Sequence, residues 1–170
     1  MRKTFVVHDR FEYEMPAPAG IVFDAFHYHQ WRHEWDSLVN ATHVLGGAAC
    51  PYVGAMTENS GGGFLKPLAM RTRFISYQPG KIAAARMEGR AFPFARWAAS
   101  MRHLPGPGPN SLMVYTYSFE CAPRPLRWLL EPITKLVFDW QTHKRFHRMR
   151  CFLENRSVEV GEWQRTGRQP

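Results

Sequence analysis

Eight histidines are the first side chains in this sequence that suggest chemistry, because imidazole is a common metal ligand and titrates near neutral pH. His143 and His147 are spaced to share one face of a helix, which is an arrangement that can bind zinc. The run is HKRFH, which lacks the glutamate of the HExxH motif and places cations beside both rings. A second group consists of His27, His29 and His33. We expect both groups to be surface histidines, and we expect no metal site and no cofactor.

Catalytic residues cannot be assigned from the order of the side chains, because neither a Ser/His/Asp nor a Cys/His grouping is evident. Asp9 and Glu58 are the acids to consider as buried bases. A carboxyl group in an apolar cavity has a raised pKa and can abstract a proton. An exposed position is the simpler interpretation of each. The three cysteines form no CxxC pair, so the sequence suggests neither a disulfide framework nor a cysteine-rich zinc site.

Two segments with strand-like alternation place large side chains on one face, since alternate residues of a strand point the same way. Tyr115 and Tyr117 add two phenols to an apolar wall, which suits a mainly hydrophobic ligand with one or two oxygens. The alternative is that these faces simply fill a core. Trp35 and Trp97 are candidates for the mouth of a pocket, again with a core position as the alternative. The two faces are Met113, Tyr115, Tyr117 and Phe119, and Met70, Thr72 and Phe74.

Arginines near these faces bear on the charge of a ligand, because a buried arginine would imply an acidic ligand group. Arg71 and Arg73 alternate with the second face and are expected outside. The pattern does not place Arg86, Arg96 and Arg102. Their simpler interpretation is an exposed position, covering a sheet edge or pairing with Glu88 or Glu120.

The C-terminal part of the sequence predicts a long helix with two apolar stripes on nearly opposite sides. One stripe is Leu129, Ile133, Leu136, Val137 and Trp140, and the other is Phe138, Thr142, Phe146, Met149 and Leu153. We assign the second stripe to the sheet because it continues to the helix end. The first is left for a kink at Pro132, a partner chain or a membrane surface. The densest basic group is interpreted as a solvated helix face and consists of Lys144, Arg145, Arg148 and Arg150.

An antiparallel sheet and this helix are the elements that must position these side chains. Residues 4–14 alternate as a half-buried strand, and a short helix over 19–26 and a second short helix follow. Glycine and proline turns then separate six expected strands, which makes them antiparallel neighbours. These strands are 37–45, 52–59, 67–77, 81–88, 94–103 and 111–121. The long helix is expected to end near Asn155, with a polar tail over 156–170.

Length and composition favour one independently folding domain. The chain has 170 residues, of which 45% are hydrophobic, enough apolar surface to form a core. The net charge of +8 attracts anions in general, without identifying one. No window approaches the roughly 18 apolar residues of a membrane span, and the first residues become charged too soon for a secretory signal. We therefore expect a protein of the cytoplasm.

Several motifs resemble the START-like (SRPBCC, helix-grip) superfamily, in its polyketide cyclase/dehydrase and lipid-transport-like branch. The run FEYEMPAPAGIVF over 11–23 is similar to the opening strand and first helix of that family, and Trp31 to Trp35 is similar to its tryptophan pair. Residues 110–119 resemble its last strand, and MRCFLE over 149–154 resembles the close of its long helix. The order of the expected elements matches as well.

The resemblance implies an α+β helix-grip fold, in which a seven-stranded curved antiparallel sheet wraps around a long C-terminal helix and two short helices follow the first strand. It also implies a single ligand-binding domain over residues 1–155, with a cavity between sheet and helix. The superfamily uses this cavity for hydrophobic or amphipathic ligands and, in some branches, for cyclase chemistry. Function must still be argued from the site itself.

We predict a protein that binds a small hydrophobic or amphipathic ligand, such as a lipid, a quinone or an aromatic polyketide-like compound. A cyclase or dehydratase-like enzyme using the same cavity is one alternative. Docking of the basic long helix on an acidic membrane or a partner, including a second copy of the chain, is another. Nucleic acid is the weakest candidate. The predicted ligand-binding residues are Trp35, Met70, Thr72, Phe74, Trp97, Tyr115, Tyr117, Phe119, Phe138, Thr142 and Phe146.

Overall fold

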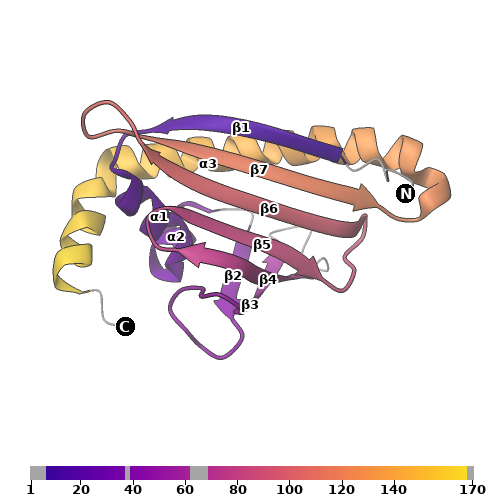
Figure 1. Ribbon diagram of the computed structural model, residues 1–170, viewed down its shortest axis with the longest axis horizontal. Coiled ribbons are helices and arrows are strands. Elements are labelled where there is room, and N and C mark those ends of the chain that lie inside the picture. Colours follow the sequence, from indigo (N-terminus) through magenta and orange to yellow (C-terminus); the bar gives the residue numbers. More distant parts are fainter. Residues whose placement is uncertain (1–6, 37–38, 62–68, 168–170) are drawn as a thin grey trace.

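A curved antiparallel sheet wraps around one long helix in the computed structural model, which describes residues 7–36, 39–61 and 69–167 (Figure 1). The strand order is β1-β7-β6-β5-β4-β3-β2, with two short helices between β1 and β2. The predicted α+β helix-grip fold is therefore confirmed. The elements are β1 (Val7–Met15), α1 (Ala19–His27), α2 (His29–Trp35), β2 (Val39–Val44), β3 (Met56–Gly61), β4 (Ala69–Gln78), β5 (Ile82–Glu88), β6 (Phe94–Pro105), β7 (Ser111–Cys121), the 3-10 turn η2 (Arg124–Leu126) and α3 (Arg127–Thr166).

Strand boundaries agree with the sequence pattern except at β3. The strand predicted over 52–59 begins only at Met56, because Gly54 has a positive φ of 87° and belongs to a turn. The predicted strands 37–45 and 67–77 begin in residues 37–38 and 67–68, which lie outside the described part of the chain. The strand predicted over 4–14 likewise begins in residues 4–6, outside the described part of the chain. The strands predicted over 81–88, 94–103 and 111–121 differ from β5, β6 and β7 by at most two residues at one end.

Register shifts bend the sheet around α3. One occurs in β4 between Phe74 and Ser76, and another in β6 between Phe94 and Arg96. An extra residue in one strand of an antiparallel pair bends that strand and increases its twist. Figure 1 shows β2 and β3 running across the direction of β1 and β7. The sheet is therefore flat enough to pack on α3 at one end and turns away from it at the other.

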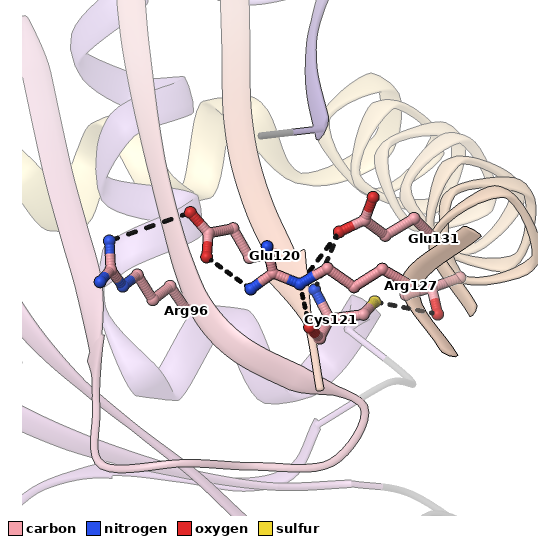
Figure 2. A network of polar contacts seen from close by, with 6 residues as sticks. Arg96, Glu120, Cys121, Arg127 and Glu131 are labelled. Atoms are coloured by element: carbon pink, nitrogen blue, oxygen red, sulfur yellow. Dashed lines mark hydrogen bonds and ion pairs between the residues drawn. The ribbon is translucent and has the colours of Figure 1, made fainter. Parts of the chain in front are cut away.

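A network of polar contacts holds the start of α3 against the end of β7 (Figure 2). Arg127 donates from Nε to the backbone oxygen of Cys121 and from a terminal nitrogen to Glu120, both at 2.9 Å. Glu131 accepts the backbone N–H of Cys121 at 3.3 Å. Arg96 is a looser partner of Glu120, at 3.9 Å. Hydrogen bonds to charged groups are stronger than neutral ones, so this network fixes the first turns of α3 relative to the sheet.

The second apolar stripe of α3, which the sequence pattern assigns to the sheet, packs against the sheet. Thr142, Phe146, Met149 and Leu153 are buried, and Phe138 packs against the same core. The opposite stripe is exposed, as described below with the cavity. Pro132 lies inside α3, after the separate turn η2.

The end of α3 differs from the sequence prediction, because the helix continues past Asn155 to Thr166. Val160 is fully buried, and Gln164 donates hydrogen bonds to the backbone oxygen of Gly20 at 2.9 Å and to Asp24 at 2.6 Å. The ring of Trp163 lies 4.6 Å from that of Tyr28. In Figure 1 the yellow end of α3 lies beside α1 and α2. The mainly polar composition of 156–166 gives no signal for this contact, because only a few side chains make it.

We predict that Val160→Ala lowers the free energy of unfolding by about 1–3 kcal/mol, because it leaves a cavity under α1. The matched control is Val158→Ala on the same helix, where the side chain is 73% exposed and the change should stay within about 0.5 kcal/mol. Urea denaturation of both variants measures the difference. Equal stabilities would show that residues beyond Asn155 contribute nothing to the folded domain.

Candidate functional site

A cavity of about 450 Å³ lies between α3 and the part of the sheet formed by β3 to β6. This volume is within the range of about 300–1,000 Å³ that is usual for small-molecule sites. Its wall is mainly apolar, with Met70, Phe74 and Met101 contributed by the strands. The most exposed of its lining side chains are Phe92, which precedes β6, and Ile133 and Val137 in the first turns of α3, so we place the mouth of the cavity there.

Small side chains on the central strands create this space. Ala83 and Ala85 on β5 and Ala99 on β6 all line the cavity. Ala85 pairs with Ala99 across the two strands, so the two methyl groups lie side by side on the wall. These three alanines lie on the same face of the sheet on which β7 carries large aromatic side chains. Their small methyl groups leave space that α3 does not fill. The sequence shows them as the run AAA over 83–85 and the pair AA over 98–99, a signal that our sequence interpretation did not use.

Seven of the predicted ligand-binding residues line the cavity. Trp97 and Tyr115 lie on the two long strands, and the others come from β4 and α3. Thr72, within the wall, shares a hydrogen bond of 2.7 Å with Thr57 between their hydroxyl groups. The seven are Met70, Thr72, Phe74, Trp97, Tyr115, Phe138 and Thr142.

The structure places the other four predicted residues in the packed core instead. Tyr117 and Phe119 have stacked rings 6.0 Å apart, and the hydroxyl of Tyr117 donates to Asp139 on α3. Phe146 is fully buried. Trp35 is also buried and donates from Nε1 to the backbone oxygen of Ala25 at 3.0 Å, so it does not close a pocket mouth. These residues lie where α3 packs directly on β7 and on α1.

Two arginines and one aspartate form a charged group at the cavity wall, in which Arg32 and Asp36 are buried and Arg145 is partly buried. Arg32 donates from Nε to Oδ2 of Asp36 at 2.9 Å. Arg145 donates to the same oxygen from Nε at 2.9 Å and from a terminal nitrogen at 2.6 Å. Both guanidinium groups also lie over the ring of Phe26, at 4.6 and 5.0 Å from its centroid. Arg32, Arg145 and Phe26 line the cavity, with Asp36 packed behind them.

The charges in this group persist at neutral pH. Burial lowers the pKa of Arg32 to about 10, and the charge of Arg145 adds to this effect, yet Arg32 stays protonated. Burial alone would raise the pKa of Asp36, but Arg145 and Arg32 hold that pKa below its ordinary value. Asp36 is therefore a carboxylate between two cations.

The sequence pattern leaves the burial of Arg86, Arg96 and Arg102 open and does not indicate Arg32 or Arg145. Arg86 and Arg96 are exposed and pair with Glu88 and Glu120, and Arg102 is exposed as well, so the simpler interpretation is confirmed for all three. The interpretation of the basic group at 144–150 as a solvated face is wrong for Arg145. This residue follows Phe138 and Gln141 along α3, on the side that borders the cavity. The signal for Arg32 was its i, i+4 spacing to Asp36, which permits an ion pair on one helix face.

His27 corrects the expectation that the histidines lie on the surface, since it is buried and lines the cavity. Its Nδ1 lies 2.8 Å from the backbone oxygen of Phe23. Burial lowers the pKa of His27 well below its ordinary value, and the neighbouring His103 adds to the shift, so the ring is neutral. A carbonyl oxygen accepts hydrogen bonds, so Nδ1 carries the proton and Nε2 keeps a lone pair.

The two acids considered as buried bases lie elsewhere. Asp9 pairs with Lys135 at 2.5 Å, and this hydrogen bond lowers the pKa of Asp9. Glu58 pairs with Arg71 at 2.8 Å. Neither carboxyl group belongs to the cavity wall. Across residues 7–36, 39–61 and 69–167, no three His, Cys, Asp or Glu side chains gather in a group that could hold a metal ion.

Exposed apolar side chains border the mouth of the cavity. Phe92, in the segment between β5 and β6, and Ile133 and Val137 on α3 line the cavity and are at least half exposed. Leu136 and Trp140 extend this surface along α3. The first apolar stripe of the helix is thus solvent-exposed in this chain and is not buried by a kink. We call it the outer stripe, which consists of Leu129, Ile133, Leu136, Val137 and Trp140.

Comparison with known proteins gives structural relatives. No family model matches the chain, and no curated protein matches it. The protein TTHA0849 from Thermus thermophilus has a TM-score of 0.70 at 14% identity, covering 86% of this chain and 97% of that one. The Zhui aromatase/cyclase from Streptomyces sp. R1128 has 0.68 at 13%, covering 98% and 100%. Norcoclaurine synthase from Thalictrum flavum has 0.66 at 12%, covering 91% and 98%. These likenesses agree with the helix-grip fold of this chain.

Proposed function

We propose that this protein binds a small, largely apolar ligand in the cavity between α3 and strands β3 to β6. The observation that carries the proposal is the cavity itself, about 450 Å³ with a mainly apolar wall. Burial of apolar ligand surface contributes roughly 25 cal/mol per Å², so such a wall is sufficient to drive binding. A lipid, a quinone or an aromatic polyketide-like compound has the required character.

Polar groups in the wall would orient the ligand. Thr142 and Tyr115 are buried beside the cavity, and Gln141 also lines it. Burial raises the pKa of Tyr115 to about 12, so its phenol is neutral and can donate a hydrogen bond. A few placed polar groups in an apolar pocket are the usual source of orientation and specificity.

Ala85→Phe tests the cavity directly, because the larger side chain would occupy the space between β5 and α3. We expect the affinity for the uncharged fluorescent probe N-phenyl-1-naphthylamine to fall by about tenfold or more, which corresponds to roughly 1.4 kcal/mol. Titration of probe fluorescence measures the affinity.

The matched control for this substitution is Ala84→Phe on the same strand. Ala84 alternates with the cavity-lining Ala83 and Ala85 and so points to the opposite face of the sheet. The affinity of the Ala84→Phe variant for the probe should equal that of the unchanged protein. Equal binding by both variants would show that the probe does not enter this cavity, and loss in both would show that the effect is not local.

An enzyme of the cyclase or dehydratase kind remains a second proposal, supported by His27. Its neutral imidazole with a free Nε2 lone pair has the form of a general base, and the ring lines the cavity. The depressed pKa of His27 makes it a weak base. A binding protein returns its ligand unaltered. Chromatography with mass analysis of a ligand after incubation therefore distinguishes the two: dehydration lowers the mass by one water, cyclisation without dehydration gives a new peak of equal mass, and recovery of the ligand alone contradicts both reactions.

Docking of the outer stripe on an acidic membrane surface is a further proposal about how an apolar ligand reaches the cavity. Exposed contiguous apolar surface marks interaction sites, and here it borders the mouth. Among the described residues, no helix has the length and hydropathy that crossing a bilayer requires. The surface would therefore lie on the membrane and not within it.

Charge around the outer stripe favours an anionic surface. Lys144 lies over the ring of Trp140, with its Nζ 5.1 Å from the centroid, and Arg148 is exposed one turn further along α3. The acids in this part of the helix point to the sheet instead: Glu131 accepts the backbone N–H of Cys121, and Asp139 accepts a hydrogen bond from the hydroxyl of Tyr117 on β7. Cations beside apolar side chains attract anionic headgroups by about 1 kcal/mol each.

We predict that Leu136→Asp weakens binding to vesicles of phosphatidylcholine with phosphatidylserine by about tenfold or more, since a carboxylate replaces an inserted side chain. Leu136 and the control position Val158 are equally exposed, at 73%, on the same helix, and Val158→Asp should bind like the unchanged protein. Vesicle co-sedimentation measures both. Added salt should weaken binding, because it screens the cations.

Results of two kinds, from vesicle binding and from sedimentation, would contradict membrane docking. One is equal binding to vesicles with and without phosphatidylserine, or no binding to either. The other is a dimer in sedimentation velocity that Leu136→Asp dissociates, which would assign the outer stripe to a second copy of the chain.

A further inference from the structure

The charge of the cavity wall is not balanced among the residues that the structure describes. Arg32 and Arg145 supply two positive charges and Asp36 supplies one negative charge, which leaves a net charge of +1. Arg32 and Asp36 are buried and Arg145 is largely shielded from solvent, with side chains that are 11%, 1% and 15% exposed. No acidic side chain of the described residues lines the cavity. A buried charge without a partner is costly, so this arrangement favours a bound anion.

Some N–H donors of the two cavity-lining arginines have no hydrogen-bond partner among the described residues. Within the described chain, Arg32 donates hydrogen bonds from Nε alone, and Arg145 uses Nε and one terminal nitrogen. Guanidinium groups carry five N–H donors in a planar fork that matches a carboxylate. The ring of Phe26 supports both planes, which limits the freedom that binding would remove. The group is thus preorganised for a planar anion.

The position of this group relative to the mouth indicates the shape of the ligand. Val137 lines the cavity at the exposed rim, and Arg145 lies two turns further along the same helix. Eight residues at 1.5 Å per residue place them about 12 Å apart along the axis. The wall between the two levels is mainly apolar. An apolar body of this length would reach from the rim to the guanidinium groups.

We propose that the ligand is an apolar carboxylic acid whose carboxylate is bound by Arg32 and Arg145. The inference rests on the proposed binding function and adds the chemical class of the ligand. One negative charge matches the net charge of the wall, and Tyr115 and Thr142, which line the same cavity, supply neutral donors. The aliphatic or aromatic body lies along the alanines of β5 and β6. Asp36 holds the guanidinium groups in place and limits their net charge to that of a monoanion.

Decanoate and 1-decanol test this assignment, because they share a chain length and differ in the charged group. Isothermal titration of the unchanged protein at neutral pH should show decanoate binding at least about tenfold more tightly, since hydrogen bonds to charged groups are the stronger ones. This comparison needs no variant. Equal or tighter binding of decanol would overturn the assignment while leaving the proposed function intact.

Arg145→Gln locates the effect. The substitution leaves Arg32 paired with Asp36 and removes the net charge, so decanoate binding should weaken by about tenfold while decanol binding stays the same. Lys144→Gln is the matched control, because it removes one exposed positive charge from the adjacent position and should change neither affinity. An equal loss in both variants would show general charge attraction and overturn the site. Failure of decanoate, decanol and the naphthylamine probe to bind at all would contradict the proposed function itself.

Discussion

The cavity depends on unequal side-chain size along the face of the sheet that meets α3. On β1 and β7 that face carries Phe11, Tyr13, Tyr117 and Phe119, and their rings pack against α3, with Tyr117 4.6 Å from Phe138. Further across the sheet, in line with Tyr117, the paired positions are Ala99 on β6 and Ala85 on β5. Protein interiors are close-packed, so a helix resting on the aromatic half cannot also descend onto the alanines. The gap persists because α3 is fixed on both sides of it, by Arg127 at its start and by the contacts of Trp163 and Gln164 near its end.

The same geometry gives the cavity two chemically different ends. The rim is apolar and exposed at Phe92, Ile133 and Val137, while the wall deeper along α3 carries the guanidinium groups of Arg32 and Arg145. Apolar burial supplies affinity without direction. Buried charge supplies direction, since an ion is costly to leave without a partner. A site with both features suits an amphipathic molecule that enters with its charged end first.

The fold could be predicted from sequence because its signals are local and repeated. Period-two alternation in residues 4–14, glycine and proline turns, and the stripe ending at Leu153 each indicate one element, and together they allow few arrangements. The end of α3 could not be predicted in this way. Its contacts come from Val160, Gly161, Trp163 and Gln164 in an otherwise polar segment, and their partners lie more than 100 residues away in α1 and α2.

The site was predictable in its walls and not in its charges. Alternation placed Thr72 and Tyr115 correctly beside a cavity, because strand periodicity determines which side chains share a face. Alternation could not distinguish these cavity-lining residues from Tyr117, which shares the face of Tyr115 but lies in the packed core against α3. Arg145 and Asp36 are 109 positions apart in the sequence. Only the fold brings Arg145 beside Asp36 and Arg32, so sequence spacing could not indicate this charged group. Small residues carried the missing information, since alanines on a core-facing strand indicate space.

Native mass spectrometry of the protein purified from its own host is the most direct test of whether the cavity holds a ligand. The account predicts a species heavier than the chain by one small molecule, which is released on denaturation and identified as an apolar carboxylic acid. A mass equal to that of the bare chain, from protein that also fails to take up decanoate, would contradict it.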